Sequence, residues 1–248
     1  MLRGVIFDLG STLLSHEYNN RWPMLRPRLI TGLIRDLHAQ GLQFDDNAFA
    51  NTFTRNIVDF DEQRQTHFKE ITSEYVLRTT FADLNISPNG LDVPRALAAY
   101  FGPSEALWKP MPRVYEILDM LRARGLWLAL VSNAADNDNV QRIIDNHNLR
   151  PYFDPIVVSA AVGVRKPNPR IFDPVLREWN IPPAEIAMVG DTLGADILGA
   201  RNVGMKSIWV TMESDTPDNE AHRHTILPDA VVASLGELPE VLRGFEHE

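Results

Sequence analysis

The chain contains no cysteine among its 248 residues. This absence excludes disulfide bonds, thiolate nucleophiles and zinc sites with cysteine ligands, and it is compatible with a reducing compartment. Long apolar runs are also missing, since none approaches the roughly 18 residues of a membrane span. Asp8 interrupts the N-terminal apolar run before it could serve as the core of a signal peptide. We therefore expect a cytoplasmic protein with no membrane partner.

Positive charge is scarce, because 33 acidic side chains outnumber 24 lysines and arginines and give a net charge of −9. Nucleic acid is not an expected partner, since binding to its phosphate backbone requires a basic face. An anionic small substrate would need locally concentrated positive charge. The content of 44% apolar and 23% charged residues is ordinary for a soluble globular protein with a substantial core. The length fits one large domain or one domain with an insertion.

An apolar run at the N-terminus ends abruptly in a carboxylate. Val5 to Phe7 form a continuous apolar segment, which is typical of a parallel strand covered on both faces, and Asp8 follows it directly. In an open α/β sheet, reactive groups collect beyond the carboxyl ends of the strands. From this segment alone, Asp8 could equally be a residue that caps the following turn or helix.

The middle of the chain and its second half differ in periodicity. Apolar spacings of three and four residues predict helices, with no convincing strand, from about residue 15 to 109. After this segment strands and helices alternate, which predicts a parallel sheet with crossover helices. Strands are expected at 126–131, 155–158, 186–189, 207–210 and 230–232, and a polar loop at 215–224. The pattern therefore predicts an α/β fold with an inserted helical domain.

Three later segments follow Asp8 in an informative order. They are Val131-Ser132-Asn133, Arg165-Lys166-Pro167, and Val189-Gly190-Asp191 with Asp196 beyond it. Together with Asp8 they resemble the four motifs of the haloacid dehalogenase-like (HAD) hydrolase superfamily, and the resemblance spans residues 5–200. It implies a Rossmann-like core formed by residues 1–14 and 111–248, with an all-helical cap at residues 15–110.

The resemblance implies a Mg²⁺-dependent phosphatase that acts on a small phosphorylated metabolite. Asp8 would form an aspartyl-phosphate intermediate, which water then hydrolyses. Because a carboxylate that attacks a phosphoryl group must overcome charge repulsion, such chemistry depends on positioning and on nearby cations. Mg²⁺ would bind to Asp8, Asp191 and the backbone carbonyl of Gly10, and oxygen ligands are what Mg²⁺ prefers. Asp196 would support this site indirectly. Each residue also has a plainer interpretation: Asp191 could cap a helix, and Asp196 could be a solvated carboxylate in the first turn of that helix.

The remaining motif residues have expected roles at the phosphate. Lys166 would hold it and balance Asp8, with Arg165 as a weaker candidate, although a Lys-Pro pair in a loop is ordinarily part of the surface. Ser132 and Asn133 would bind phosphate oxygens through a hydroxyl and a backbone N–H. Thr12 would orient Asp8, or simply shape a turn.

One position departs from the family pattern. Most phosphatases of the superfamily carry a second aspartate two residues after the nucleophile, and this chain has Gly10 there. That aspartate acts as general acid and base, a contribution of roughly 10²- to 10⁴-fold. We therefore expect slow turnover on poor leaving groups. If Gly10 has a positive φ, replacing it with Asp would strain the loop.

Three alternatives remain open from the sequence. A 2-haloacid dehalogenase also uses an aspartate nucleophile but works without Mg²⁺ and typically lacks the Gly-Asp pair of the fourth motif. A phosphonatase would need a lysine from the cap, for which Lys69, or Lys109 at its border, is the candidate. A protein that binds or regulates without efficient turnover is the third.

The sequence leaves the substrate and the choice between monomer and homodimer open. Polar and aromatic residues cluster just after the first motif, and substrate-selecting side chains are expected among Tyr18, Arg21, Trp22 and Arg26.

Overall fold

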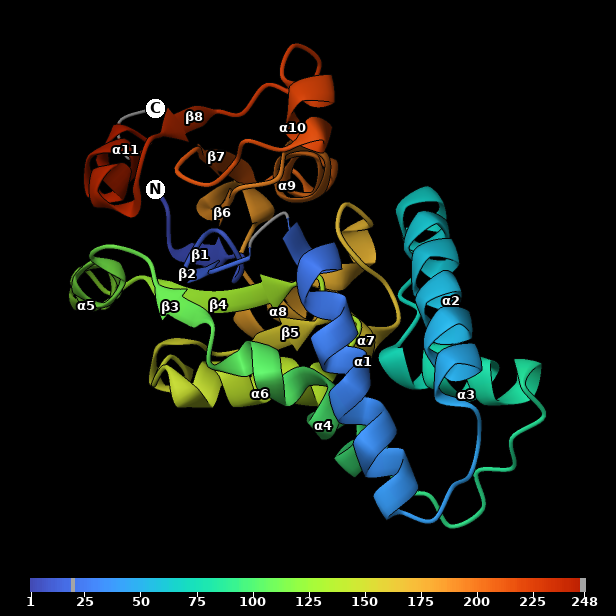
Figure 1. Ribbon diagram of the computed structural model, residues 1–248. Helices are drawn as coiled ribbons and strands as arrows, with labels where there is room; N and C mark the ends of the chain where they lie inside the picture. Colours follow the sequence, from blue (N-terminus) through green and yellow to red (C-terminus); the bar gives the residue numbers. More distant parts are fainter. Residues whose placement is uncertain (19–20, 246–248) are drawn as a thin grey trace.

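The computed structural model describes residues 1–18 and 21–245, which fold into an α/β core and a helical region beside it (Figure 1). A six-stranded sheet in the order β5-β4-β1-β6-β7-β8 forms the centre of the core, and all its strands are parallel. The strands are β1 (Gly4–Phe7), β4 (Trp127–Ser132), β5 (Ile156–Val158), β6 (Ile186–Gly190), β7 (Lys206–Val210) and β8 (Ala230–Val232). The predicted parallel α/β architecture is confirmed.

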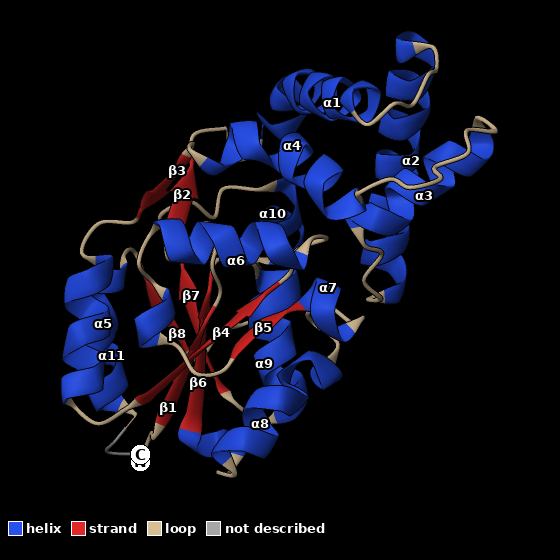
Figure 2. Cartoon of the chain, turned by 90° about the horizontal axis from the view of Figure 1, so that it is seen from below, coloured by secondary structure: helices blue, strands red, loops and turns tan. Residues whose placement is uncertain are grey.

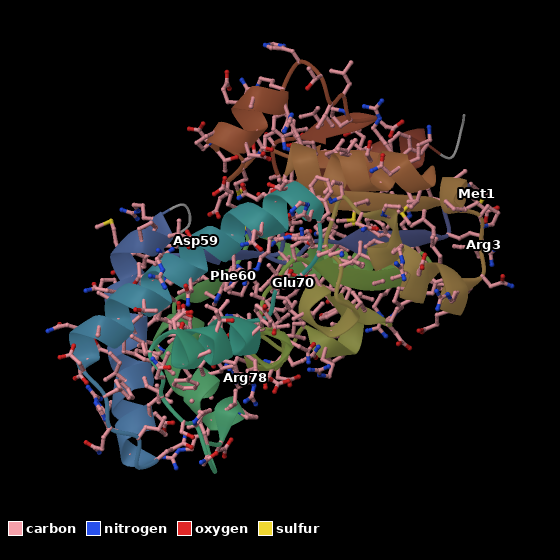
Figure 3. All side chains as sticks on the ribbon, turned by 90° about the vertical axis from the view of Figure 1, so that its right-hand side faces the viewer. Met1, Arg3, Asp59, Phe60, Glu70 and Arg78 are labelled. Carbon is pink, nitrogen blue, oxygen red and sulfur yellow. The ribbon has the colours of Figure 1, made fainter. Side chains whose placement is uncertain are left out.

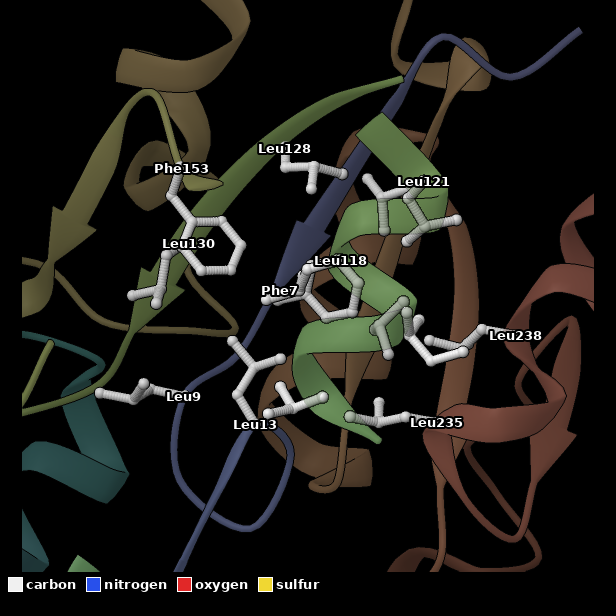
Figure 4. Packing of buried hydrophobic residues seen from close by; sticks show 14 of the residues in the cluster. Phe7, Leu9, Leu13, Leu118, Leu121, Leu128, Leu130, Phe153, Leu235 and Leu238 are labelled. Atoms are coloured by element: carbon white, nitrogen blue, oxygen red, sulfur yellow. The ribbon is translucent and has the colours of Figure 1, made fainter. Parts of the chain in front are cut away.

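Helices cover both faces of this sheet (Figure 2). Alternate residues of β1 enter different apolar clusters, because successive side chains of a strand point to opposite faces. Phe7 packs in one cluster with Leu118 and Leu238 (Figure 4), whereas Ile6 packs in the other with Val175. The first face is covered by α5 (Val114–Ala123), α6 (Asn137–Asn146) and α11 (Leu238–Gly244), and the second by α8 (Asp173–Trp179) and α9 (Leu198–Val203).

Two short helices complete the core, α7 (Ser159–Val162) and α10 (Pro217–His222). The expectation of a polar loop at 215–224 is wrong where α10 forms. The Thr216 side chain caps this helix by accepting a hydrogen bond from Asn219 N, Pro217 lies in its first turn, and Asp218 favours its amino end. The helix was not predicted because its sequence is mostly polar, and it has too few apolar residues to display the helical period.

Four helices between residues 22 and 105 share an apolar cluster of their own. They are α1 (Trp22–Ala39), α2 (Asp46–His67), α3 (Ser73–Asp83) and α4 (Val93–Glu105). Their buried side chains include Leu33, Phe49 and Phe81, and the predicted helical periodicity is the cause of this packing. In Figure 2 these helices lie beyond the ends of the core strands.

The expectation that residues 15–109 contain no strand is wrong at both borders. There β2 (Leu14–His16) and β3 (Trp108–Pro110) pair antiparallel and form a separate two-stranded sheet. Neither strand belongs to the core sheet. Strands of three residues are too short to display a period of two, and they depend on pairing between residues about a hundred positions apart. Within the described residues, no helix has the length and apolar character that a membrane span requires.

Candidate active site

Three adjacent strands bring the sequence motifs together. β1 lies between β4 and β6, and the parallel register aligns their carboxyl ends. Asp8 directly follows β1, and its backbone N–H donates to Val189 O at 2.9 Å, which extends the pairing with β6 by one residue. Ser132 is the last residue of β4, and Asp191 directly follows β6. The motif side chains therefore meet at one edge of the sheet, where ligand sites of open α/β folds lie.

Three carboxylates and one ammonium group form a buried cluster at this edge. Asp8, Asp191 and Asp196 each offer an oxygen within 4.8 Å of the others. Lys166 Nζ lies 2.5 Å from Asp8 Oδ1 and 2.7 Å from Asp196 Oδ1. We call these four residues the aspartate cluster. One ammonium group faces three carboxylates, so two formal negative charges are left without a partner inside the cluster.

Local backbone geometry positions Asp196 against the strand end. A π-helical turn at Leu193–Ile197 precedes α9, and Asp196 Oδ2 accepts a hydrogen bond from Thr192 N at 3.0 Å. A Cβ atom at Gly190 would lie 2.3 Å from the Asp196 carboxylate, which is a severe overlap. Glycine at 190 is therefore required for this carboxylate to approach the strand, and the chain turns into α9 through a π-turn.

Lys166 is held by its backbone as well as its side chain. Asn133 Oδ1 accepts from Lys166 N at 2.8 Å, and Asn133 Nδ2 donates to Lys166 O at 3.1 Å. Lys166 Nζ also donates to Val131 O at 2.7 Å. The Asn133 side chain is thus used to position Lys166, while its backbone N–H remains the group predicted to bind phosphate.

Burial and crowding perturb the titration of the cluster. Burial, opposed in part by Lys166, raises the pKa of Asp8 to about 6. Burial and the neighbouring carboxylates of Asp196 and Asp8 raise the pKa of Asp191 well above its usual value. Burial alone would lower the pKa of Lys166, but Asp196 and Asp8 outweigh it and raise that pKa. The ammonium group is therefore a constant charge, whereas the carboxylates repel one another.

Two residues of the loop after Asp8, Thr12 and Gly10, bear on the sequence predictions. Thr12 is fully buried, but its hydroxyl donates to or accepts from no described residue, so the predicted contact that orients Asp8 is not seen. Gly10 does not have a positive φ; the neighbouring Ser11 does, at 56°. A Cβ atom at Gly10 would lie 3.4 Å from the Trp108 indole, so the ring of Trp108 occupies the space beside this glycine.

Arg165 points away from the aspartate cluster towards the helical region. Its guanidinium Nη1 lies 3.9 Å from Glu70 Oε2, and Glu70 also pairs with Arg64 Nε at 3.0 Å and accepts from Ser159 Oγ at 2.6 Å. The Glu70 side chain is fully buried where the α2–α3 connection meets the core (Figure 3). We call Arg64, Glu70, Ser159 and Arg165 the junction cluster.

Two further residues that the sequence did not suggest support Asp191. Trp209 Nε1 and Asn219 Nδ2 each donate to Asp191 O at 2.8 Å, and Asn219 Oδ1 accepts from Leu193 N at 2.7 Å. Asn219 lies in α10, in the segment expected to be a loop. The capping pattern at Thr216 was the one signal that could have indicated an ordered position for this residue.

A cavity of about 360 Å³ begins at Leu9, Gly10, Ser132 and Asn133 and extends between the core and the helical region. Trp22 lines it, whereas Tyr18, Arg21 and Arg26 do not; the Arg21 guanidinium instead stacks over Tyr18 at 6.0 Å. Neither Lys69 nor Lys109 lines this cavity, and both are exposed.

A buried acidic site at the carboxyl edge of a parallel sheet is the arrangement of an α/β enzyme. The profile of a family described as haloacid dehalogenase-like hydrolase matches residues 2–204, and the chain belongs to this family.

Relatives and solved structures agree with this assignment. Glyceraldehyde 3-phosphate phosphatase of Pyrococcus abyssi is 29% identical over 209 residues, which cover 84% of this chain and 81% of the relative. A HAD phosphatase from Thermococcus onnurineus superposes with a TM-score of 0.66 at 22% identity, covering 98% of this chain and 99% of that one. A 2-haloacid dehalogenase from Pseudomonas syringae gives a TM-score of 0.63 at 23% identity over 99% of this chain and 100% of that one. At these identities the two structures show the shared fold alone.

Proposed function

We propose that the chain is a Mg²⁺-dependent phosphatase that hydrolyses a small phosphorylated metabolite through an aspartyl-phosphate on Asp8. The observation that carries this proposal is the aspartate cluster, in which three buried carboxylates lie together and two of them contact a single ammonium group. Leu9 and Gly10, which follow Asp8 directly, line a cavity. The name of the archaeal phosphatase relative, which matches most of this chain, supports a phosphorylated substrate.

The residues of the cluster fit a divalent cation. The candidate donors are oxygens of Asp8 and Asp191 and the carbonyl of Gly10, a hard oxygen set suited to Mg²⁺. The two unpaired negative charges and the raised pKa values of Asp8 and Asp191 favour the binding of a positively charged ion at this position. Asp196 pairs with Lys166 and would support the site without binding the ion. When bound, Mg²⁺ supplies positive charge that offsets repulsion between Asp8 and the phosphate.

The reaction requires two displacements at phosphorus. In the first, an oxygen of Asp8 attacks phosphorus, and the bond to the ester oxygen breaks; that oxygen keeps the electron pair and takes a proton from water. In the second, water attacks phosphorus, loses its proton to solvent, and the bond to Asp8 breaks to release phosphate. Lys166 offsets the negative charge, and Ser132 and the Asn133 backbone N–H hold phosphate oxygens.

We further propose that residues 15–110 act as a cap over a core formed by residues 1–14 and 111–248. The separate apolar cluster of α1–α4 and the cavity between them and the core support this division. The cap would enclose the substrate and select the leaving group.

The alternatives are less well supported by the same residues. A dehalogenase has no use for the uncompensated negative charge beside Asp8, which an anionic haloacid would meet without a cation. A phosphonatase requires a lysine at the substrate, and Lys69 and Lys109 are exposed and lie outside the cavity wall.

The test is a screen of phosphate monoesters with and without Mg²⁺, with Asp8→Asn run in parallel. We expect hydrolysis that requires Mg²⁺ and is lost in Asp8→Asn. Asp59→Asn, which changes an exposed aspartate on α2, is the matched control and should retain full activity. Equal Mg²⁺-dependent turnover by wild type and Asp8→Asn would overturn the proposal. Tight binding of phosphate esters without turnover would indicate the regulatory alternative that Gly10 raises.

A further inference from the structure

The cavity at the aspartate cluster has two ends of different character. Gly10, Ser132 and Asn133 form the end where phosphate would bind, and side chains of α1, α2, α3, α4, β3 and the core helix α6 enclose the remainder. The part of a substrate that leaves with the ester oxygen must therefore occupy the space between the helical region and α6. The composition of these walls then indicates what kind of leaving group they fit.

The walls around the leaving group are largely aromatic and apolar. The large apolar side chains that line them are Trp22, Phe53, Ile57, Tyr100, Phe101 and Trp108. Trp108 lies beside the loop that follows Asp8, since its indole would be 3.4 Å from a Cβ at Gly10. His16 contacts that indole edge to face at 4.8 Å and stacks on Trp22 at 4.3 Å, so neighbouring rings fix both tryptophans. Burial raises the pKa of Tyr100 to about 12, and its phenol stays neutral.

The charged side chains along the cavity do not favour a second anionic group. In the described part of the chain they are Asp61, Arg64 and Asp136. The Arg64 guanidinium is already bound by Asp61, Glu70 and the Ile71 carbonyl. Two carboxylates thus face one guanidinium that is already neutralised. A leaving group with a carboxylate or another phosphate would meet net negative charge in a partly desolvated site.

The size of the cavity is also informative. A volume of about 360 Å³ lies in the range of pockets that enclose ring-containing ligands, roughly 300–1,000 Å³. A three-carbon leaving group would fill only part of it. Among the described residues, the wall offers it one donor and one acceptor that lack partners, Trp108 Nε1 and Asn139 Oδ1, and its other polar groups would face largely apolar side chains. Polar groups placed against an apolar wall without hydrogen-bond partners weaken binding.

We propose that the preferred substrates are phosphate monoesters whose leaving group is an uncharged alcohol or phenol with an aromatic or other apolar ring. This inference rests on the proposed phosphatase function and specifies its substrate class. It differs from the three-carbon substrate named for the archaeal relative. The ring would lie between Trp108 and the apolar side chains of α2 and α4, with the phosphate at Asp8.

The experiment compares primary phosphate esters, so that the acidity of the leaving group varies little. We would measure kcat/KM with Mg²⁺ for 2-naphthylmethyl phosphate, ethyl phosphate and glyceraldehyde 3-phosphate, with acetyl phosphate as a minimal substrate. The naphthylmethyl ester should exceed the two small esters on the order of 10- to 100-fold, because the ring buries additional apolar surface. A second pair, 4-carboxyphenyl phosphate and its methyl ester, tests charge, and the uncharged ester should be preferred.

A space-filling variant with a matched control locates the effect. Ile57→Trp fills the cavity from α2, whereas Val58→Trp places the same side chain on the exposed face of that helix. The first variant should lose the preference for the naphthylmethyl ester over ethyl phosphate, and the second should resemble wild type.

The outcomes separate the two proposals. If wild type hydrolyses acetyl phosphate but prefers glyceraldehyde 3-phosphate to the naphthylmethyl ester, the substrate inference is wrong and the phosphatase function stands. If no ester is hydrolysed in a Mg²⁺-dependent and Asp8-dependent manner, both are wrong. The wild-type comparison decides this even if Ile57→Trp fails to fold.

Discussion

The aspartate cluster and the junction cluster are both buried and ionic. They are adjacent in the chain, because Lys166 belongs to the aspartate cluster and Arg165 to the junction cluster. They differ in charge balance. At the junction, Arg64 and Arg165 face the carboxylate of Glu70, and Asp61, a half-exposed residue at the edge of the cluster, also pairs with Arg64. With Asp61 included, opposite charges are equal in number. In the aspartate cluster one ammonium group faces three carboxylates.

This difference distinguishes a structural role from a chemical one. A balanced and hydrogen-bonded buried ion pair can hold two parts of a chain in register, and its loss is costly because a charge is left buried alone. A cluster with an excess of negative charge is unfavourable, because the carboxylates repel one another. Groups with perturbed pKa values are common at functional sites, where a ligand or a reaction supplies the missing positive charge. The predictions below test this contrast, from the largest expected effect to the smallest.

Removing the cation of the aspartate cluster should have the largest effect. Lys166→Met leaves three carboxylates without their ammonium partner and removes a charge that offsets the transferred phosphoryl group. We expect kcat/KM to fall by roughly 10³-fold or more. Steady-state kinetics with Mg²⁺ measures this, and Lys69→Met, at an exposed lysine, should leave kcat/KM unchanged. A Lys166→Met enzyme within tenfold of wild type would contradict the role assigned to this residue.

Breaking the balance of the junction should lower stability more than activity. Glu70→Gln retains the shape of the side chain but leaves Arg165 without a carboxylate and Arg64 with Asp61 alone. We expect a loss of about 3 kcal/mol in the free energy of unfolding, measured in urea. The matched control is Glu74→Gln, which breaks an exposed pair with Arg78 and should cost less than about 0.5 kcal/mol. Equal losses in the two variants would remove the distinction between the junction cluster and a surface pair.

Metal and protons should compete for the aspartate cluster. Without a divalent cation, the folded protein holds the proton of Asp8 up to a pKa of about 6, above the usual value of 3.8. The stabilisation that the folded protein gains by binding this proton on Asp8 is therefore complete below about pH 4 and is lost as pH rises through about 6. Mg²⁺ should consequently raise the melting temperature by a few degrees more at pH 7 than at pH 5. In Asp8→Asn this difference should shrink, and a metal effect independent of pH in wild type would argue against the site.

The smallest expected effect concerns Gly10, which departs from the family pattern. Because glycine has no acidic side chain, rates on aryl phosphates should fall steeply as the leaving group becomes less acidic. Gly10→Asp is not opposed by a positive φ, but its Cβ must fit beside Trp108, so a gain of only about tenfold on alkyl phosphates is expected from an unoptimised acid. Gly10→Ala introduces the same contact without the carboxyl group and should show no gain. A flat leaving-group profile in wild type would mean that another residue acts as the acid.

Much of the core could be predicted because its signals are local. The strands that lead to Asp8, Ser132 and Asp191 are continuous apolar runs, and parallel strand ends necessarily meet at one edge. The junction cluster could not be predicted in this way, since nothing near Glu70 indicates that its side chain is buried against Arg165. The same holds for Asn219, whose contact with Asp191 depends on a short polar helix, and for the β2–β3 pair. These features arise from tertiary contacts that a window of sequence does not contain.

The central claim is that Asp8 is the group to which phosphate is transferred. The most direct measurement is an acid-quenched single turnover with Mg²⁺, followed by peptide mapping for a phosphoryl group and treatment with hydroxylamine. Our account predicts one phosphoryl group on the peptide that contains Asp8, removed by hydroxylamine because it is an acyl phosphate, and none in Asp8→Asn. A phosphoryl group on any other residue, or turnover by Asp8→Asn at the wild-type rate, would contradict it.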